Sequence, residues 1–124
     1  MSQDYETIAM VDNEEDIVSL FIELLQANGY AVIGFTNPLF LIDHIHEHPD
    51  RFGLILIDYR MPQMTGCHLA NQIHAINPKI KMILLTAFDD IVNNALNLEI
   101  AKKPITLNQI LDLVDRNLNS LIEI

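Results

Sequence analysis

The chain has 124 residues, half of them hydrophobic, which suits a single domain over residues 1–124 and excludes a disordered chain. Its 17 acidic residues outnumber its 7 Lys and Arg residues, so the formal net charge is −10. A charge of this sign disfavours direct binding to nucleic acids and anionic membranes, whereas it suits divalent cations and basic protein surfaces.

The sequence also indicates where the protein works. Cys67 is the single cysteine, so no intrachain disulfide can form, which fits a reducing cytosol. The first residues lack the basic and apolar segments of a secretory signal, and no apolar run is long enough to cross a bilayer. We therefore expect a soluble, cytoplasmic protein.

Short apolar runs alternate with segments of helical periodicity along the chain. We predict buried strands at 7–11, 31–35, 54–57, 81–85 and 99–102. Apolar residues spaced three and four apart predict helices at Ile17–Leu25, Leu39–Ile45, Leu69–Ile76 and Ile110–Leu121. A fifth segment, Asp89–Asn97, can form only a short helix because it is rich in asparagine, a poor helix former.

The boundaries of these segments carry their own signals. Gly29 follows the first helix in the usual C-terminal position. Asn37-Pro38 predicts a helix start, and that helix should run to about His48. Thr106 and Gln109 have the spacing of a capping box before the last helix. Strands that alternate with helices in this way predict an α/β fold of three layers with a parallel sheet.

The histidines near the end of the second helix are candidates for a metal site. His44 and His48 would share one helix face, with His46 between them. No cysteine or third clustered ligand accompanies them, and histidines also suit the negative end of a helix. We therefore favour a solvated helix end over a metal site.

Polar side chains follow four of the predicted strands at the points where these strands end. They are Asp12 with Asn13, Asp58, Thr86 and Lys103. Because the C-terminal ends of parallel strands meet at one edge of a sheet, we expect these side chains to converge. A carboxylate can attack phosphorus, oxygen ligands hold Mg²⁺, and a lysine with a hydroxyl stabilises a transferring phosphoryl group. Each residue also has a structural explanation, such as a helix cap at Asp12, but the set predicts a phosphoryl-transfer site.

The same residues resemble the receiver domains of two-component response regulators, including the single-domain chemotaxis-type regulators. The motifs that carry the resemblance are Val11-Asp12-Asn13-Glu14, Asp58-x-x-Met61-Pro62-x-x-x-Gly66, Thr86-Ala87 and Lys103-Pro104. They occur in the family's order and cover essentially the whole chain. The resemblance implies the flavodoxin-like fold, with a five-stranded parallel sheet in the order 2-1-3-4-5.

The resemblance also implies a role for each site residue. Asp58 would accept a phosphoryl group from the phosphohistidine of a sensor histidine kinase or a phosphotransfer protein. Thr86 would be the switch hydroxyl, and Lys103 would contact the phosphoryl group. Mg²⁺ would be held by Asp12, Asn13, Asp58 and the backbone carbonyl of Arg60. The protein would be no enzyme in the usual sense, although it takes part in its own phosphorylation and dephosphorylation and signals to a downstream protein target.

Three departures from the family pattern bear on these expectations. Asn13 stands where the family has a second acid, so we expect weaker Mg²⁺ binding and slower phosphorylation. Ile100 replaces an aromatic residue three positions before the lysine, which leaves the usual route of signal transmission in doubt. Sixteen residues separate Thr86 from Lys103, more than one helical turn fewer than the resemblance implies, so the fourth helix should be short and Leu96 and Leu98 exposed.

Other functions are compatible with parts of the pattern. A pseudo-receiver, which binds a partner protein without phosphorylation, is favoured by Asn13, Ile100 and the short fourth helix. It is opposed by the intact Asp58, Thr86 and Lys103. A phosphohydrolase of the haloacid-dehalogenase type would need a second Asp two residues after Asp58, where this chain has Arg60. The kinase, the target and the oligomeric state, a homodimer included, stay open, as does the choice between a stand-alone regulator and a piece of a longer one.

Overall fold

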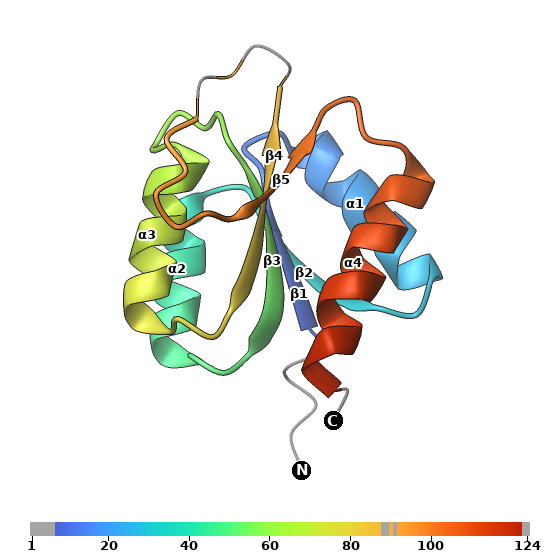
Figure 1. Ribbon diagram of the computed structural model, residues 1–124, viewed down its shortest axis with the longest axis horizontal. Coiled ribbons are helices and arrows are strands. Elements are labelled where there is room, and N and C mark those ends of the chain that lie inside the picture. Colours follow the sequence, from blue (N-terminus) through green and yellow to red (C-terminus); the bar gives the residue numbers. More distant parts are fainter. Residues whose placement is uncertain (1–6, 88–89, 91, 123–124) are drawn as a thin grey trace.

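The computed structural model describes residues 7–87, 90 and 92–122, without the side chains of 119–122. Its centre is a sheet of five parallel strands in the order β2-β1-β3-β4-β5, which confirms the predicted order (Figure 1). The strands are β1 (Thr7–Val11), β2 (Ala31–Phe35), β3 (Phe52–Asp58), β4 (Lys81–Thr86) and β5 (Glu99–Lys102). β3 is longer than predicted and includes Asp58 as its last residue.

Helices cover both faces of the sheet and give the three layers that the sequence predicts. They are α1 (Glu15–Ala27), α2 (Pro38–Glu47), α3 (Gly66–Ile76) and α4 (Leu107–Ile122). Figure 1 shows α2 and α3 on one face of the sheet and α1 and α4 on the other. No helix in the described part of the chain is both long and apolar enough to cross a membrane.

The helix starts follow from side chains that accept hydrogen bonds from the first turn. The side chain of Asn37 accepts from the backbone N–H of Leu39 at 2.9 Å, and Pro38 follows it as the first helical residue. The predicted capping box of α4 is confirmed, because the Thr106 side chain accepts from the backbone N–H of Gln109 at 3.2 Å and the Gln109 side chain accepts from the backbone N–H of Thr106 at 2.8 Å.

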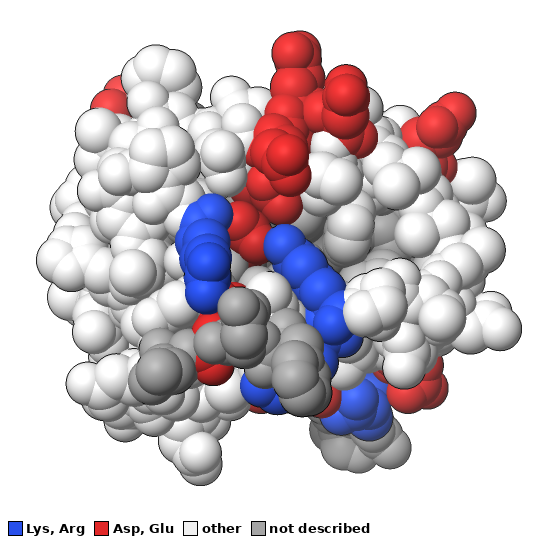
Figure 2. All heavy atoms as spheres, turned by 90° about the horizontal axis from the view of Figure 1, so that it is seen from above, with Lys and Arg blue, Asp and Glu red and all other residues white. Residues whose placement is uncertain are grey.

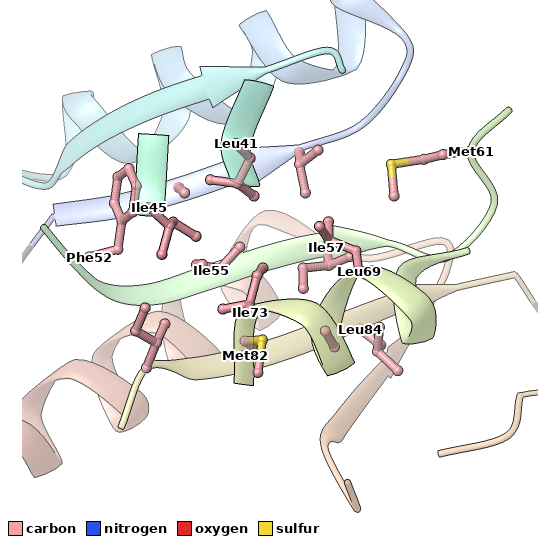
Figure 3. Packing of buried hydrophobic residues seen from close by; sticks show 14 residues of the cluster. Leu41, Ile45, Phe52, Ile55, Ile57, Met61, Leu69, Ile73, Met82 and Leu84 are labelled. Atoms are coloured by element: carbon pink, nitrogen blue, oxygen red, sulfur yellow. The ribbon is translucent and has the colours of Figure 1, made fainter. Parts of the chain in front are cut away.

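The core consists of two hydrophobic clusters, one on each face of the sheet. Alternate residues of β3 belong to opposite clusters: Ile55 and Ile57 face α2 and α3, whereas Leu54 and Leu56 face α1 and α4. Figure 3 shows Ile55 and Ile57 packed among side chains of the two helices on their face. All seven residues of β3 are buried, which explains why this strand is an unbroken apolar run up to Asp58.

The connection between β4 and β5 departs further from the family pattern than predicted. Residues 92–98 contain no helix, whereas the sequence predicts a short one over 89–97; residues 88, 89 and 91 lie outside the described part. The side chain of Asn94 accepts from the N–H of Leu98 at 2.9 Å and donates to its carbonyl at 2.8 Å. These bonds replace the ladder of a helix, and Asn97 has a positive φ of 57°.

The expected exposure of Leu96 and Leu98 is wrong. Both side chains are partly buried and pack against the hydrophobic cluster on the α2–α3 face of the sheet. Without a helix in this stretch, an irregular backbone with a turn at residues 95 and 96 places both side chains against the core, and they form no exposed apolar patch.

His44 of α2 belongs to an aromatic cluster, whereas His46 is exposed. The ring of His44 contacts Phe35 edge-on with 5.6 Å between centroids, and it also lies 5.3 Å from Phe52 and 5.2 Å from His48. Within the described residues, no three His, Cys, Asp or Glu side chains gather in a way that could hold a metal ion. His44 Nε2 is buried and has no hydrogen-bond partner there. Burial, followed by the charge of Arg51, lowers the pKa of His44 below its ordinary value.

This lowered pKa predicts a loss of stability in mild acid. The unfolded chain binds a proton at His44 near the ordinary pKa of 6.5, whereas the folded chain resists it, so stability is complete above that pH and falls as the pH drops below it. Urea unfolding at about pH 7.5 and about pH 5.5 measures this loss. His44→Phe should lose less stability between the two conditions than the wild type, whereas His46→Phe, at an exposed position of the same helix, should lose as much. Equal losses in His44→Phe and the wild type would contradict this explanation.

Candidate functional site

The polar residues singled out in the sequence lie together at the C-terminal edge of the sheet. Asp12 follows β1, Asp58 ends β3, Thr86 ends β4 and Lys103 follows β5. Among the described residues only three polar or charged ones are buried as whole residues, and they are Asp12, Asp58 and Thr86, with 1%, 5% and 0% of their surface exposed. Figure 2 looks down on this edge and shows acidic and basic side chains gathered at its middle. Burying a polar group costs free energy, so three buried polar residues at one edge of the sheet indicate a functional site.

A direct ion pair joins the two strand ends that carry opposite charges. Lys103 Nζ lies 2.5 Å from Asp58 Oδ1, and the Asp58 side chain is only 7% exposed, against 40% for Lys103. Burial raises the pKa of the Asp58 carboxyl, and the hydrogen bond from Lys103 offsets part of that rise. The lysine therefore provides the charge compensation that a buried carboxylate requires.

Backbone contacts fix the positions of these side chains. Tyr59 N–H donates to the carbonyl of Leu85 at 3.0 Å, and Lys103 N–H donates to the carbonyl of Thr86 at 2.7 Å. Gly66, the first residue of α3, comes so close to β3 that an added Cβ would lie 2.7 Å from the backbone oxygen of Asp58. A side chain at this position would displace the backbone of Asp58, so the glycine is needed for close approach.

Asp12 and Asn13 occupy different environments although they are neighbours. Asp12 is buried, and its Oδ1 accepts from the backbone N–H of Glu14 at 2.9 Å. Val11 pairs with Ile57 in the sheet, so Asp12 and Asp58 are the next residues on neighbouring strands. Burial raises the pKa of Asp12, and the charge of Asp58 raises it further. Asn13 is exposed. The structure thus brings Asp12 and Asp58 together, with Asn13 beside them on the surface.

Thr86 is a buried polar residue whose hydroxyl finds no hydrogen-bond partner among the described residues. Its Oγ1 lies in a fully buried residue and makes no hydrogen bond to any described part of the chain. An unsatisfied buried hydroxyl costs about 1–3 kcal/mol. A cost of this kind is typical of sites that complete their hydrogen bonds only when a ligand is present.

Asp90 is a member of this site that sequence reasoning did not identify. Its side chain is 1% exposed, its Oδ1 pairs with Arg60 Nε, and its Oδ2 accepts from the backbone N–H of Ala87 at 2.6 Å. Burial alone would raise the pKa of Asp90, but the bonds from Ala87 and Arg60 outweigh burial and lower it. The sequence gives only a weak signal for this role of Asp90, namely an acidic residue three positions after Ala87. Its partner Arg60 is thirty residues away, so no local pattern indicates the pair.

A hollow of about 340 Å³ opens beside the site. Side chains of α1, including Ile17, Leu20 and Phe21, form an apolar wall, and Asp12 and Lys103 form its polar end. Leu20 is 57% exposed there. The site is therefore open to a partner on the α1 side.

The chain matches known proteins along most of its length. Residues 8–115 match the response regulator receiver domain family. The transcriptional regulatory protein CreB of Escherichia coli is 31% identical over 96 residues, which cover 77% of this chain but only 41% of CreB. The response regulator receiver protein CpdR of Brucella abortus is 30% identical over 87 residues, which cover 70% of this chain and 71% of CpdR.

Solved structures show the same fold. The crystal structure of a response regulator receiver domain protein from Clostridium thermocellum has a TM-score of 0.84 to this chain, with 22% identity, and covers 93% of this chain and 95% of its own. At that level of identity the likeness concerns the fold alone. Together with the match over residues 8–115, these findings show that the chain belongs to the response regulator receiver domains of two-component systems, with their flavodoxin-like fold.

Proposed function

We propose that this chain is a phosphoacceptor, in which Asp58 takes a phosphoryl group from the phosphohistidine of a sensor kinase or phosphotransfer protein. The observation that carries the proposal is the buried Asp58 carboxylate, paired with Lys103 at 2.5 Å at the open edge of the sheet. An oxygen of Asp58 attacks phosphorus, an O–P bond forms, the N–P bond of the donor breaks, and the imidazole leaves with the electron pair.

The other polar residues then have defined tasks. Lys103 pairs with the carboxylate before the transfer and with the phosphoryl oxygens afterwards, so its charge is used in both states. The unpartnered Thr86 hydroxyl donates to a phosphoryl oxygen and gains the hydrogen bond that it otherwise lacks. The hollow beside Asp12 and Lys103 leaves room for the donor to approach.

The residues at the site also fit a magnesium ion. Asp12 and Asp58 directly follow or end neighbouring strands, and the charge of Asp58 contributes to the raised pKa of Asp12, an arrangement that a divalent cation relieves. Asp12, Asp58, the amide oxygen of Asn13 and the backbone carbonyl of Arg60 would hold it. Bound Mg²⁺ would neutralise charge on the carboxylate and the phosphoryl oxygens. Because Asn13 is neutral, we propose that this chain binds Mg²⁺ more weakly than a receiver with a third acid.

The output is a protein contact. Thr86 lies directly before the stretch that leads to β5, and Ile100 on β5 is 37% exposed. We propose that a change at Thr86 reaches the exposed side of β5 through this stretch, without an aromatic side chain at position 100. The net charge of −10 makes a downstream protein, and not a nucleic acid, the proposed target.

A pseudo-receiver is the second candidate function. The exposed, neutral Asn13 and the helix-free residues 92–98 favour it, because both depart from the features that a phosphorylation switch uses. In that case the same surfaces would bind a partner constitutively, and Asp58 would stay unmodified. The two candidates differ in one measurable property, the formation of an acyl phosphate.

Intact mass spectrometry after incubation with Mg²⁺ and acetyl phosphate tests the leading proposal. The wild type should gain one phosphoryl group, and Asp58→Asn should gain none because the amide cannot attack phosphorus. Asp50→Asn, which removes an exposed acid away from the site, should react like the wild type. Absence of the adduct in every variant, with a histidine phosphodonor as well as with acetyl phosphate, would favour the pseudo-receiver.

Isothermal titration with Mg²⁺ tests the role proposed for Asn13. Asn13→Asp adds a negative charge beside two carboxylates and should tighten Mg²⁺ binding by roughly three- to tenfold, with a faster reaction with acetyl phosphate. Asn71→Asp makes the same chemical change at an exposed position of α3 and should leave the affinity unaltered. An unchanged affinity in Asn13→Asp would show that position 13 is not a ligand.

A further inference from the structure

The carboxylate of Asp90 occupies a small anion-binding site within the chain. One oxygen pairs with the guanidinium of Arg60, and the other accepts from the backbone N–H of Ala87 at 2.6 Å. The backbone N–H of Asp90 in turn donates to the carbonyl of Ala87 at 3.2 Å. The Asp90 side chain is 1% exposed, although Arg60 itself is 65% exposed. A backbone N–H and a guanidinium directed at one carboxylate are donors that also suit phosphate oxygens.

These donors belong to the edge of the sheet at which Asp58 lies. Arg60 comes two residues after Asp58, and Ala87 directly follows Thr86, the residue with the unpartnered hydroxyl. Asp58 pairs with Leu85 of β4 in the sheet. Ala87, two residues after Leu85, therefore lies just beyond the end of that neighbouring strand. The charges interact as well: Asp90 raises the pKa of Asp58, and Lys103 lowers the pKa of Asp90. Asp90 thus lies within the electrostatic field of the acceptor and its lysine.

We propose that Asp90 is an internal competitor of the phosphoryl group, because its carboxylate holds the Ala87 N–H and the Arg60 guanidinium that an anion on Asp58 would otherwise engage. The competition rests on the proposed phosphorylation of Asp58. The anion site formed by Ala87 and Arg60 does not depend on it. Phosphorylation then includes an exchange of anions, in which the phosphoryl oxygens replace the carboxylate of Asp90. The exchange slows the forward reaction and favours the unmodified state.

Two variants separate this role from a structural one. Asp90→Asn retains the size of the side chain and an oxygen that can accept from the N–H of Ala87, but it loses the ion pair with Arg60. Asp90→Ala removes both interactions. Asp50→Asn is the control. It removes one negative charge, as Asp90→Asn does, but from an exposed position away from the site.

The first readout is the rate of the reaction with acetyl phosphate in Mg²⁺. Asp90→Asn should react about tenfold faster than the wild type and Asp90→Ala at least as fast, as expected when one charge-assisted hydrogen bond no longer has to be broken. Asp50→Asn should react at the wild-type rate. Unchanged or slower reactions in both Asp90 variants would overturn the proposal, since a residue that merely orders the turn would give that result.

The second readout does not depend on phosphorylation. Inorganic phosphate is titrated without Mg²⁺ while the backbone amide of Ala87 is followed by ¹H–¹⁵N NMR. We expect a saturable shift of this amide in Asp90→Ala, none in the wild type, and its loss when Arg60→Gln is added to Asp90→Ala. A shift in Asp90→Ala without any acyl phosphate would mean that the proposed function fails while the anion site stands. No shift in Asp90→Ala would overturn the competitor role.

Discussion

The structure depends on the burial of one carboxylate at the end of a fully buried strand. Asp58 closes β3, whose seven residues are all buried, and a charge in that position requires a compensating charge close by. Lys103 supplies it at 2.5 Å, and the bond from Lys103 N–H to the carbonyl of Thr86 fixes the lysine to the end of β4. The parallel order of the strands brings these residues to one edge, and the close approach of Gly66 keeps the backbone of Asp58 in place.

Most of the fold can be read from the sequence because its signals are local. The strands are apolar runs with abrupt ends, and the start of α2 at Asn37-Pro38 and the capping box at Thr106 and Gln109 need only neighbouring residues. The same holds for the convergence of Asp12, Asp58, Thr86 and Lys103, since strand ends in a parallel sheet must share an edge.

The features that sequence reasoning missed depend on contacts between distant segments or on competition between side chains and backbone. Asn94 bonds both backbone groups of Leu98, so residues 92–98 leave the helical path and carry Leu96 and Leu98 onto the core. Asp90 owes its place to Arg60, thirty residues earlier in the chain, and no local pattern reveals that pair.

Two features of this chain act on phosphorylation in the same direction. As proposed above, a neutral Asn13 would weaken the magnesium site, and the carboxylate of Asp90 holds donors that the phosphoryl group would use. Both disfavour the modified state without removing the groups that form it. We therefore propose a receiver whose acceptor residue is complete and whose phosphorylation is restrained, in contrast to a pseudo-receiver, in which the acceptor residue is not used.

Mapping the modified residue tests this account most directly. Borohydride reduces an acyl phosphate, so an aspartate that carried a phosphoryl group becomes homoserine, which peptide mass spectrometry locates in the sequence. After incubation with a phosphodonor and Mg²⁺, the account predicts homoserine at position 58 and aspartate at positions 12 and 90. Homoserine at Asp12 or Asp90, with Asp58 unchanged, would contradict it, because the paired carboxylate at the end of β3 would then not be the acceptor.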